Sequence, residues 1–304
     1  MQVSTSNEYD QLKSVMIGSV EKFSWPVDDK EFESTIARST FPADLPKGNL
    51  PDFVLDEARE DLDNLAHTLQ SRGIEVVRPS ISASSWAYSA RDIILTVGAT
   101  VIECPTPFSS RSRELDLYPE LKQSGAKVIR APRPTTTDDP MFDAANVLKV
   151  NDKLVYSLSH SANEAGAEWL QQQVGTEFEV IKWRAVEHQI THIDSTLLSC
   201  RENTVIANGA RVSVDTLPAF MRDYEIIWVN DCAPRDFHVF PIASKWIGMN
   251  VLSLNPETIV VDEIQKDLIQ TLEKHKFEVL SLPMRQSRTL GGGFHCVTCD
   301  VHRS

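Results

Sequence analysis

Five polar side chains of this sequence form a set that could perform covalent chemistry on a cationic substrate. A cysteine with a histidine and several carboxylates is typical of nucleophilic catalysis, because a thiolate attacks carbon and a histidine moves protons near neutral pH. The carboxylates outnumber what a cysteine protease needs, and they would oppose an oxyanion. They suit a guanidinium, whose N–H donors match paired carboxylates and whose carbon is electrophilic only while protonated. The five residues are Asp92, Asp143, His192, Asp194 and Cys296.

Each of these residues also has an ordinary structural interpretation. An Asp at a strand start is most often a turn or capping residue, and a lone His192 is more often a satisfied interior histidine. Cys296 and Cys299 have the spacing of a zinc or redox motif, but the other cysteines offer no second zinc pair. A redox motif opens a helix, whereas this one follows the glycines 291–293, which also lack the Lys-Ser/Thr of a phosphate loop. We therefore expect no metal site.

A repeated unit along the chain would position these residues. Each copy predicts a two-strand hairpin, an amphipathic helix and one more strand. The first copy has a hairpin at 91–105 that turns at Gly98, a helix at 111–125 and a strand at 126–131. The hairpin of the second copy turns at Asn151-Asp152. The later copies cover 142–183, 192–229 and 245–282, with helices at 163–175, 214–224 and 264–276, and the fifth is split between 294–303 and 15–79, with a helix at 53–73.

Five units of one type, the last closed by both chain ends, indicate a ring. We predict an α/β fold in which a single domain, 1–304, forms a five-bladed α/β propeller of ββαβ modules with pseudo-fivefold symmetry. An ordinary mixed α/β sheet is the alternative. In a ring, the first strand of every hairpin starts at the same end of the central axis. The five polar residues would then line one pocket.

The composition of the chain argues against two classes of binding partner. The chain has 304 residues, a net charge of −13 and a pI near 5.1, which oppose binding to phosphate backbones and anionic lipid. We therefore expect no nucleic-acid and no membrane partner. No apolar run reaches the roughly 18 residues of a membrane span, and no secretory signal is visible. Five scattered cysteines suit a reducing compartment, so we expect a cytoplasmic protein.

Seven segments of the chain carry a resemblance to a known family. The most specific is LGGGFHCVTCDVHR at 290–303, and the others are NEYDQLKSVMIG, RDIILTVGATVIECP, GAKVIRAPRPT, FDAANVL, HIDSTLL and SKWIGMNVL. In their order along the chain, these segments resemble those of the L-arginine:glycine amidinotransferases, and the resemblance covers almost the whole chain. More distantly, the chain is similar to the arginine deiminases and dimethylarginine hydrolases of the same guanidino-group modifying superfamily. The amidinotransferase fold is a five-bladed α/β propeller, so the resemblance and the repeat imply one architecture.

The resemblance also implies roles for the five residues. Cys296 corresponds to the nucleophile that becomes an amidino-cysteine, His192 to the general acid/base and Asp143 to the carboxylate paired with it. Asp92 and Asp194 correspond to the acids that hold the guanidinium. L-arginine would be the donor and would leave as ornithine, a primary amine would be the acceptor, and no cofactor would be needed. The family also makes a homodimer reasonable.

Two further residues correspond to contacts with the amino-acid end of the donor. Arg211 falls where the family contacts the substrate α-carboxylate. Ser244 matches one of two family serines, and Ala243 replaces the other.

The chain departs from the family at the expected acceptor pocket. Asn146 stands where the family has Asp, and Thr191 where glycine-using members have Met directly before the catalytic histidine. Together with Gln189 and Ala243, these residues predict a more polar or differently shaped site, and the chain is also shorter between 134 and 142. These differences argue against glycine as the acceptor and favour an amino sugar, a lysine-like amine or a specialised-metabolite amine.

Two other functions fit part of this pattern. A hydrolase of the arginine deiminase or dihydrolase type would use water in place of the amine. A non-catalytic arginine-binding protein would keep only the fold, and the retention of all five core residues opposes it.

Overall fold

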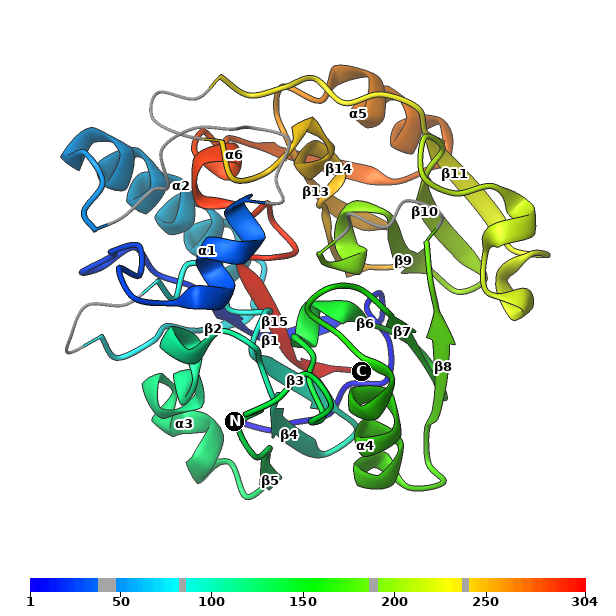
Figure 1. Ribbon diagram of the computed structural model, residues 1–304. Helices are drawn as coiled ribbons and strands as arrows, with labels where there is room; N and C mark the ends of the chain where they lie inside the picture. Colours follow the sequence, from blue (N-terminus) through cyan, green and yellow to red (C-terminus); the bar gives the residue numbers. More distant parts are fainter. Residues whose placement is uncertain (38–47, 82–85, 186–190, 237–240) are drawn as a thin grey trace.

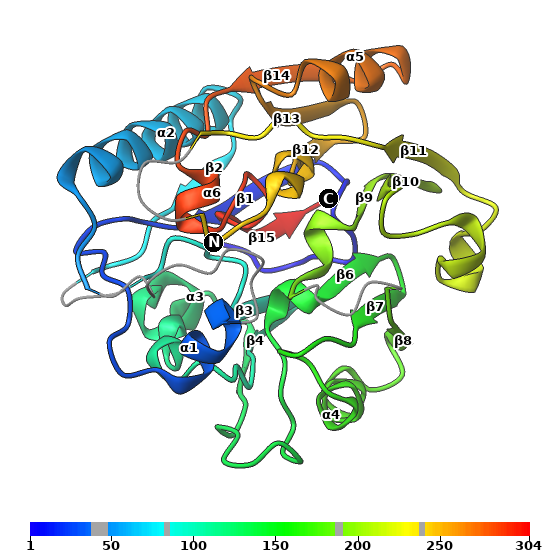
Figure 2. The same cartoon turned by 45° about the horizontal axis from the view of Figure 1, so that its top comes forward.

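The strands of the described part of the chain form five separate three-stranded sheets. The computed structural model describes residues 1–37, 48–81, 86–185, 191–236 and 241–304. In four sheets the first strand pairs antiparallel with the second, which pairs parallel with the third. Figures 1 and 2 show the sheets arranged as a ring. This arrangement confirms the five-bladed α/β propeller.

Four blades are continuous in sequence. Their strands are β3 (Ile94–Val97), β4 (Thr100–Glu103) and β5 (Lys127–Arg130); β6 (Val147–Val150), β7 (Lys153–Ser157) and β8 (Glu179–Trp183); β9 (Leu197–Arg201), β10 (Thr204–Asn208) and β11 (Glu225–Val229); and β12 (Leu252–Asn255), β13 (Thr258–Asp262) and β14 (Glu278–Leu282). The β6–β7 hairpin turns where expected, because Asn151 accepts the left-handed φ of 56° that the turn requires.

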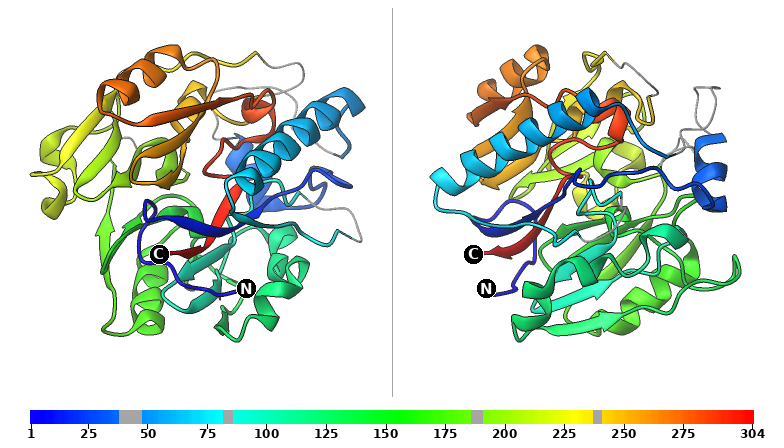
Figure 3. Two further views of the ribbon diagram at one scale, coloured as in Figure 1. Left: turned by 180° about the vertical axis from the view of Figure 1, so that it is seen from behind. Right: turned by 90° about the vertical axis from the view of Figure 1, so that its left-hand side faces the viewer.

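The fifth blade joins the two ends of the chain. Its middle strand β1 (Leu12–Ile17) pairs antiparallel with β15 (Thr298–Arg303) and parallel with β2 (Glu75–Val77). This confirms the split fifth copy. Figure 3 shows β1 and β15 side by side, with the long helix α2 (Asp52–Ser71) running past them. The segment that carries Cys296 is therefore anchored by a strand from the opposite end of the chain.

Two other outer helices form close to their predicted positions. They are α4 (Glu164–Val174) and α5 (Lys266–Lys274). The side chain of Asn163 caps α4 by accepting a 2.8 Å hydrogen bond from the backbone N–H of Gly166. The helices α1 (Lys30–Ala37) and α6 (Ser287–Leu290) lie outside the repeated unit. No helix of the described ranges is long and apolar enough to cross a membrane.

Two predicted helices are wrong. In place of 111–125 the chain forms η1 (Ser109–Arg111), η2 (Glu114–Leu117) and the short helix α3 (Pro119–Gln123), and in place of 214–224 it forms η5 (Val214–Thr216) and η6 (Ala219–Met221). Arg113 adopts a left-handed φ of 74°, which interrupts a helix. Pro119 and Pro218 lack the N–H that a helix interior needs, so each limits the helix on its N-terminal side.

A short 3-10 turn precedes the first strand of three blades. These turns are η3 (Ala144–Asn146), η4 (Ile193–Ser195) and η7 (Lys245–Met249). Their N-cap residues are Asp143, His192 and Ser244, which thus occupy equivalent positions in neighbouring blades. The apolar core lies between blades. For example, Leu95 and Ile102 of one blade pack in a cluster with Phe142 and Leu154 of the next. This packing fixes the turns relative to one another.

Candidate active site

His192 lies between two carboxylates from neighbouring blades. Its Nε2 is 3.1 Å from Asp143 Oδ2, and its Nδ1 is 3.6 Å from Asp92 Oδ1. Asp143 is fully buried, and its other oxygen accepts a 2.6 Å hydrogen bond from the Thr106 hydroxyl. Burial alone would lower the pKa of His192, but Asp92 and Asp143 raise it to about 9. The imidazole is therefore oriented, and it carries a second proton at neutral pH.

Cys296 is held by two contacts on the other side of the site. Its Sγ donates to Asp194 Oδ2 at 3.1 Å, and its backbone N–H donates to Asn250 Oδ1 at 2.9 Å. The Asn250 amide also donates to the Asp194 carbonyl at 3.3 Å, so one side chain joins both segments. Burial, with the charges of Asp194 and Asp92, raises the pKa of the Cys296 thiol well above its ordinary value. The thiol thus keeps its proton when no cation is bound.

Glycine allows the backbone before Cys296 to pass close to Asn250. A Cβ built on Gly293 would lie 2.8 Å from Asn250 Cβ and 3.0 Å from the Asn250 carbonyl oxygen. Gly291 has a φ of 79°, which favours glycine. The three consecutive glycines therefore allow the backbone before Cys296 to pass close to Asn250.

The histidine and cysteine ends belong to one electrostatic site. Asp194 is among the charges that raise the pKa of His192. Burial raises the pKa of Asp194, but His295 and, after it, His192 lower that pKa. Asp92 contacts His192 and also raises the pKa of Cys296. The structure thus brings together the five residues selected from the sequence, each from the start of a blade.

Arg111 is a residue of this site that the sequence reasoning missed. Its guanidinium forms an ion pair with Asp92 Oδ2 and donates to Glu114 Oε1 at 2.7 Å. It also lies 4.9 Å from the centre of the Trp86 ring. The second carboxylate oxygen, Asp92 Oδ1, is buried and has no hydrogen-bond partner among the described residues. One acceptor therefore remains for an N–H donor of a ligand.

Arg211 and Ser244 lie beside the segments that carry the five residues. Arg211 Nη1 donates to Ser195 Oγ at 2.9 Å and to Thr196 Oγ1 at 3.1 Å, directly after Asp194 in sequence. This supports the turn η4. Ser244 precedes η7 in the neighbouring blade. Contact with a substrate stays a prediction for both residues.

The acceptor-pocket candidates divide into buried and partly exposed groups. Asn146 is fully buried, and its Nδ2 donates to the Thr191 carbonyl at 2.6 Å while its Oδ1 accepts from the Asp143 N–H at 3.0 Å. It therefore links the two segments that hold His192 and Asp143. The Thr191 side chain and Ala243 are partly exposed. Gln189 lies outside the described residues.

Known proteins resemble this chain in sequence and in fold. No protein-family model matches the chain. It is 38% identical to inosamine-phosphate amidinotransferase 1 of Streptomyces griseus, over 99% of this chain and 97% of the relative. It is 27% identical to the L-arginine:L-lysine amidinotransferase of Pseudomonas savastanoi pv. phaseolicola, with 99% and 94% covered.

The structural comparison gives the same result. A solved inosamine-phosphate amidinotransferase from Streptomyces griseus superposes with a TM-score of 0.92 at 37% identity, and covers 99% of this chain and 97% of the other. The sequence likeness extends through every blade that contributes a side chain to the site. The chain belongs to the amidinotransferase family.

Proposed function

We propose that this amidinotransferase uses L-arginine as donor, forms a covalent amidino intermediate on Cys296 and releases ornithine. The observation that carries the proposal is the contact of the Cys296 thiol with Asp194, in a site where Asp92 Oδ1 accepts no hydrogen bond from the described residues. Such a site needs a cation to become reactive. The similarity to a relative named for arginine and lysine supports arginine as that cation.

The donor binds through its guanidinium. Its N–H groups donate to the buried carboxylates of Asp92 and Asp194, which match its planar fork. These carboxylates raise the pKa of the empty-site Cys296 thiol, and the bound cation offsets them. The thiolate therefore forms only beside a substrate. This protects a buried cysteine from side reactions until arginine arrives.

The first half-reaction moves the amidino group to sulfur. The Cys296 thiolate attacks the guanidinium carbon, the C–S bond forms, and the bond from carbon to the departing δ-nitrogen breaks. His192 is protonated at neutral pH and gives its proton to that nitrogen, while Asp143 holds the ring. The thiol proton is released to solvent when arginine binds, and ornithine gains the proton of His192, which is left neutral. The amidino-cysteine retains the positive charge between Asp92 and Asp194.

The second half-reaction reverses these steps on another amine. A neutral primary amine attacks the amidino carbon, the C–N bond forms, and the C–S bond breaks. His192, left neutral by the first half, accepts the proton that the new bond displaces. Sulfur leaves as the thiolate and takes up one proton from solvent as the product departs, while His192 keeps the amine proton for the next cycle. Because one site serves donor and acceptor in turn, the kinetics are ping-pong.

We propose that the acceptor is a primary amine on a polar scaffold, such as an inosamine phosphate. The support is the 38% identity with the inosamine-phosphate enzyme over nearly the whole chain. Thr191 directly before His192 and the small side chain of Ala243 agree with a polar, open acceptor side. We further propose that residues 1–304 act as one domain. The homodimer and the cytoplasmic location stay predictions.

An acceptor screen tests this function. The protein is incubated with arginine and, in separate reactions, inosamine phosphate, lysine or glycine, and ornithine is measured by chromatography. We expect ornithine with inosamine phosphate, slower release with the other amines, and none from Cys296→Ser. Citrulline and ammonia from arginine alone would establish a hydrolase. No turnover of arginine with any amine would remove arginine as the donor.

A further inference from the structure

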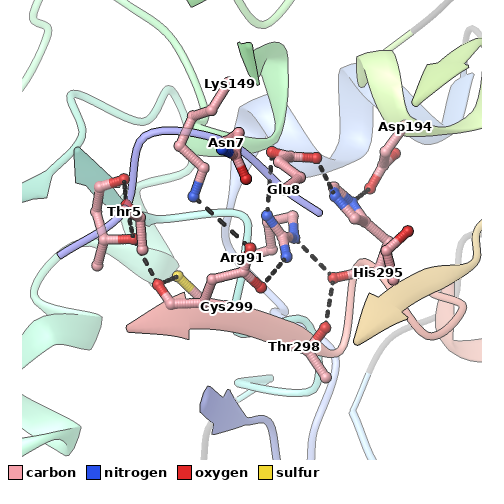
Figure 4. A network of polar contacts seen from close by, with 12 residues as sticks. Thr5, Asn7, Glu8, Arg91, Lys149, Asp194, His295, Thr298 and Cys299 are labelled. Atoms are coloured by element: carbon pink, nitrogen blue, oxygen red, sulfur yellow. Dashed lines mark hydrogen bonds and ion pairs between the residues drawn. The ribbon is translucent and has the colours of Figure 1, made fainter. Parts of the chain in front are cut away.

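A second histidine, His295, lies directly before Cys296 in a buried network of charges. Its Nδ1 is 3.0 Å from Asp194 Oδ2, and its Nε2 is 2.8 Å from Glu8 Oε2. All three residues are at least 95% buried. Figure 4 shows the ring between the two carboxylates, one from η4 and one from the N-terminal segment. Neither Glu8 nor His295 has a role in the chemistry described above.

The geometry fixes the protonation state of His295. A neutral imidazole has one N–H and one lone pair, whereas both ring nitrogens here face a carboxylate. A lone pair against a buried carboxylate would leave two acceptors without a donor, which is costly away from water. Only the imidazolium donates to both Glu8 and Asp194.

The surrounding charges agree with this state. Burial and Arg91 lower the pKa of His295, but Glu8 and Asp194 raise it by more. Arg91 donates to the His295 carbonyl at 2.8 Å and pairs with Asp300, so its own charge is matched beside the ring. Lys149, from β6, likewise faces Asp300 at 3.9 Å.

His295 acts on the site through one oxygen atom. Asp194 Oδ2 accepts from His295 Nδ1 and also from Cys296 Sγ at 3.1 Å. Burial would raise the pKa of Asp194, but His295 holds it well below its ordinary value, so this acid stays ionised. The imidazolium also adds a positive charge within the network that faces the thiol. Asp194 can then meet both a guanidinium and the thiol in one orientation.

We propose that His295, kept as an imidazolium by Glu8, is a positioning residue that fixes the charge and orientation of Asp194 against Cys296. The proposal rests on the proposed role of Cys296 as nucleophile. It gives the N-terminal segment a part in catalysis: Glu8 reaches the site through a blade formed by both chain ends and sets the electrostatics of the nucleophile.

Histidine NMR measures the first part of the proposal without any substrate. In protein labelled with ¹⁵N-histidine, the His295 signal is assigned by its loss in His295→Gln. We expect imidazolium shifts at both nitrogens across the pH range in which the protein stays folded. A neutral His295 ring at pH 7 in the wild-type protein would overturn the proposal. It would leave the proposed transfer of amidino groups untouched.

Glu8→Gln measures the second part. The amide oxygen still accepts from His295 Nε2, but the negative charge is lost, so the His295 pKa falls towards or below its ordinary value of about 6.5. We expect kcat/KM for arginine to gain a new ionisation and to fall about tenfold or more as pH rises through that pKa. KM for arginine rises more than kcat falls, because Asp194 binds the donor.

A matched control separates this effect from general damage. Glu225 pairs with His275 Nδ1 at 2.7 Å on the surface, and Glu225→Gln removes the same kind of charge away from the site. It should leave the pH profile unchanged. If the role of Glu8 were purely structural, Glu8→Gln would lower the melting temperature and reduce kcat/KM by the same factor at every pH, without a new ionisation. That outcome would contradict the proposal.

Discussion

Asp194→Asn should make the Cys296 thiol more acidic and the enzyme less active, and these two effects together test the proposed electrostatic roles of Asp194. The Asp194 carboxylate lies 3.1 Å from Cys296 Sγ and raises the pKa of the thiol. Removing its charge should make the thiol of the free protein more acidic. The same change removes a partner of the guanidinium, so arginine should be used less well. A more acidic nucleophile would thus accompany a slower enzyme.

The size of the first effect follows from the separation of the charges. Two unit charges about 4 Å apart interact by about 4 kcal/mol at an effective dielectric constant near 20. This equals about three pKa units at about 1.4 kcal/mol per unit. His295 shares Asp194 Oδ2 and offsets part of that charge. We therefore expect the pKa of Cys296 to fall by about one to two units, which raises the thiolate fraction about ten- to a hundredfold.

The thiolate is measured by its ultraviolet absorbance during a pH titration. Asp194→Asn is compared with the wild type, and each is corrected by the same protein carrying Cys296→Ser, since four other cysteines are present. Asp152→Asn, on the exposed β6–β7 turn, serves as the control. We expect kcat/KM for arginine to fall at least tenfold, because a charge-assisted hydrogen bond contributes about 1.5–3 kcal/mol. An unchanged or higher thiol pKa would refute the reasoning.

Three further variants follow from the structure. Asp143→Asn should lower the pKa of His192 from about 9 towards its ordinary value, because Asp143 is one of the carboxylates that raise it. The pKa is measured by an NMR titration of His192, and an unchanged midpoint would contradict the pairing of His192 with Asp143. Asp92→Asn should raise KM for arginine about tenfold or more. The melting temperature should stay nearly unchanged, because Arg111 keeps its two hydrogen bonds with Glu114. Full activity of this variant would show that Asp92 does not bind the donor. Leu154→Ala should cost about 2–5 kcal/mol of unfolding free energy in urea, and a loss below about 1 kcal/mol would deny it a core position.

The repeat in the sequence was sufficient to predict the ring and the residues at its centre. Hairpin turns at Gly98 and Asn151 have local signals, and the matching positions of Asp143 and His192 follow once the copies are aligned. The split blade could be predicted for the same reason, because β1 and β15 complete one copy. Local periodicity failed at 111–125 and 214–224. There Pro119 and Pro218 interrupt apolar spacing that otherwise resembles a helix.

The supporting residues could not be found by this route. Arg111 falls inside the segment that was wrongly predicted as a helix, and its contact with Asp92 depends on the loop that forms there. Asn250 and Glu8 reach the site from other blades, and neither shares the position of the five residues in the repeat. Such contacts depend on how the blades close around the axis, which periodicity does not encode.

Mass spectrometry of the intact protein after brief exposure to arginine, without an acceptor, tests the central claim most directly. We expect an added amidino group, located on Cys296 by peptide mapping, and its loss when an acceptor amine is supplied. Cys296→Ser should acquire none. An unmodified Cys296 after a single turnover that has released ornithine would contradict covalent transfer through this residue.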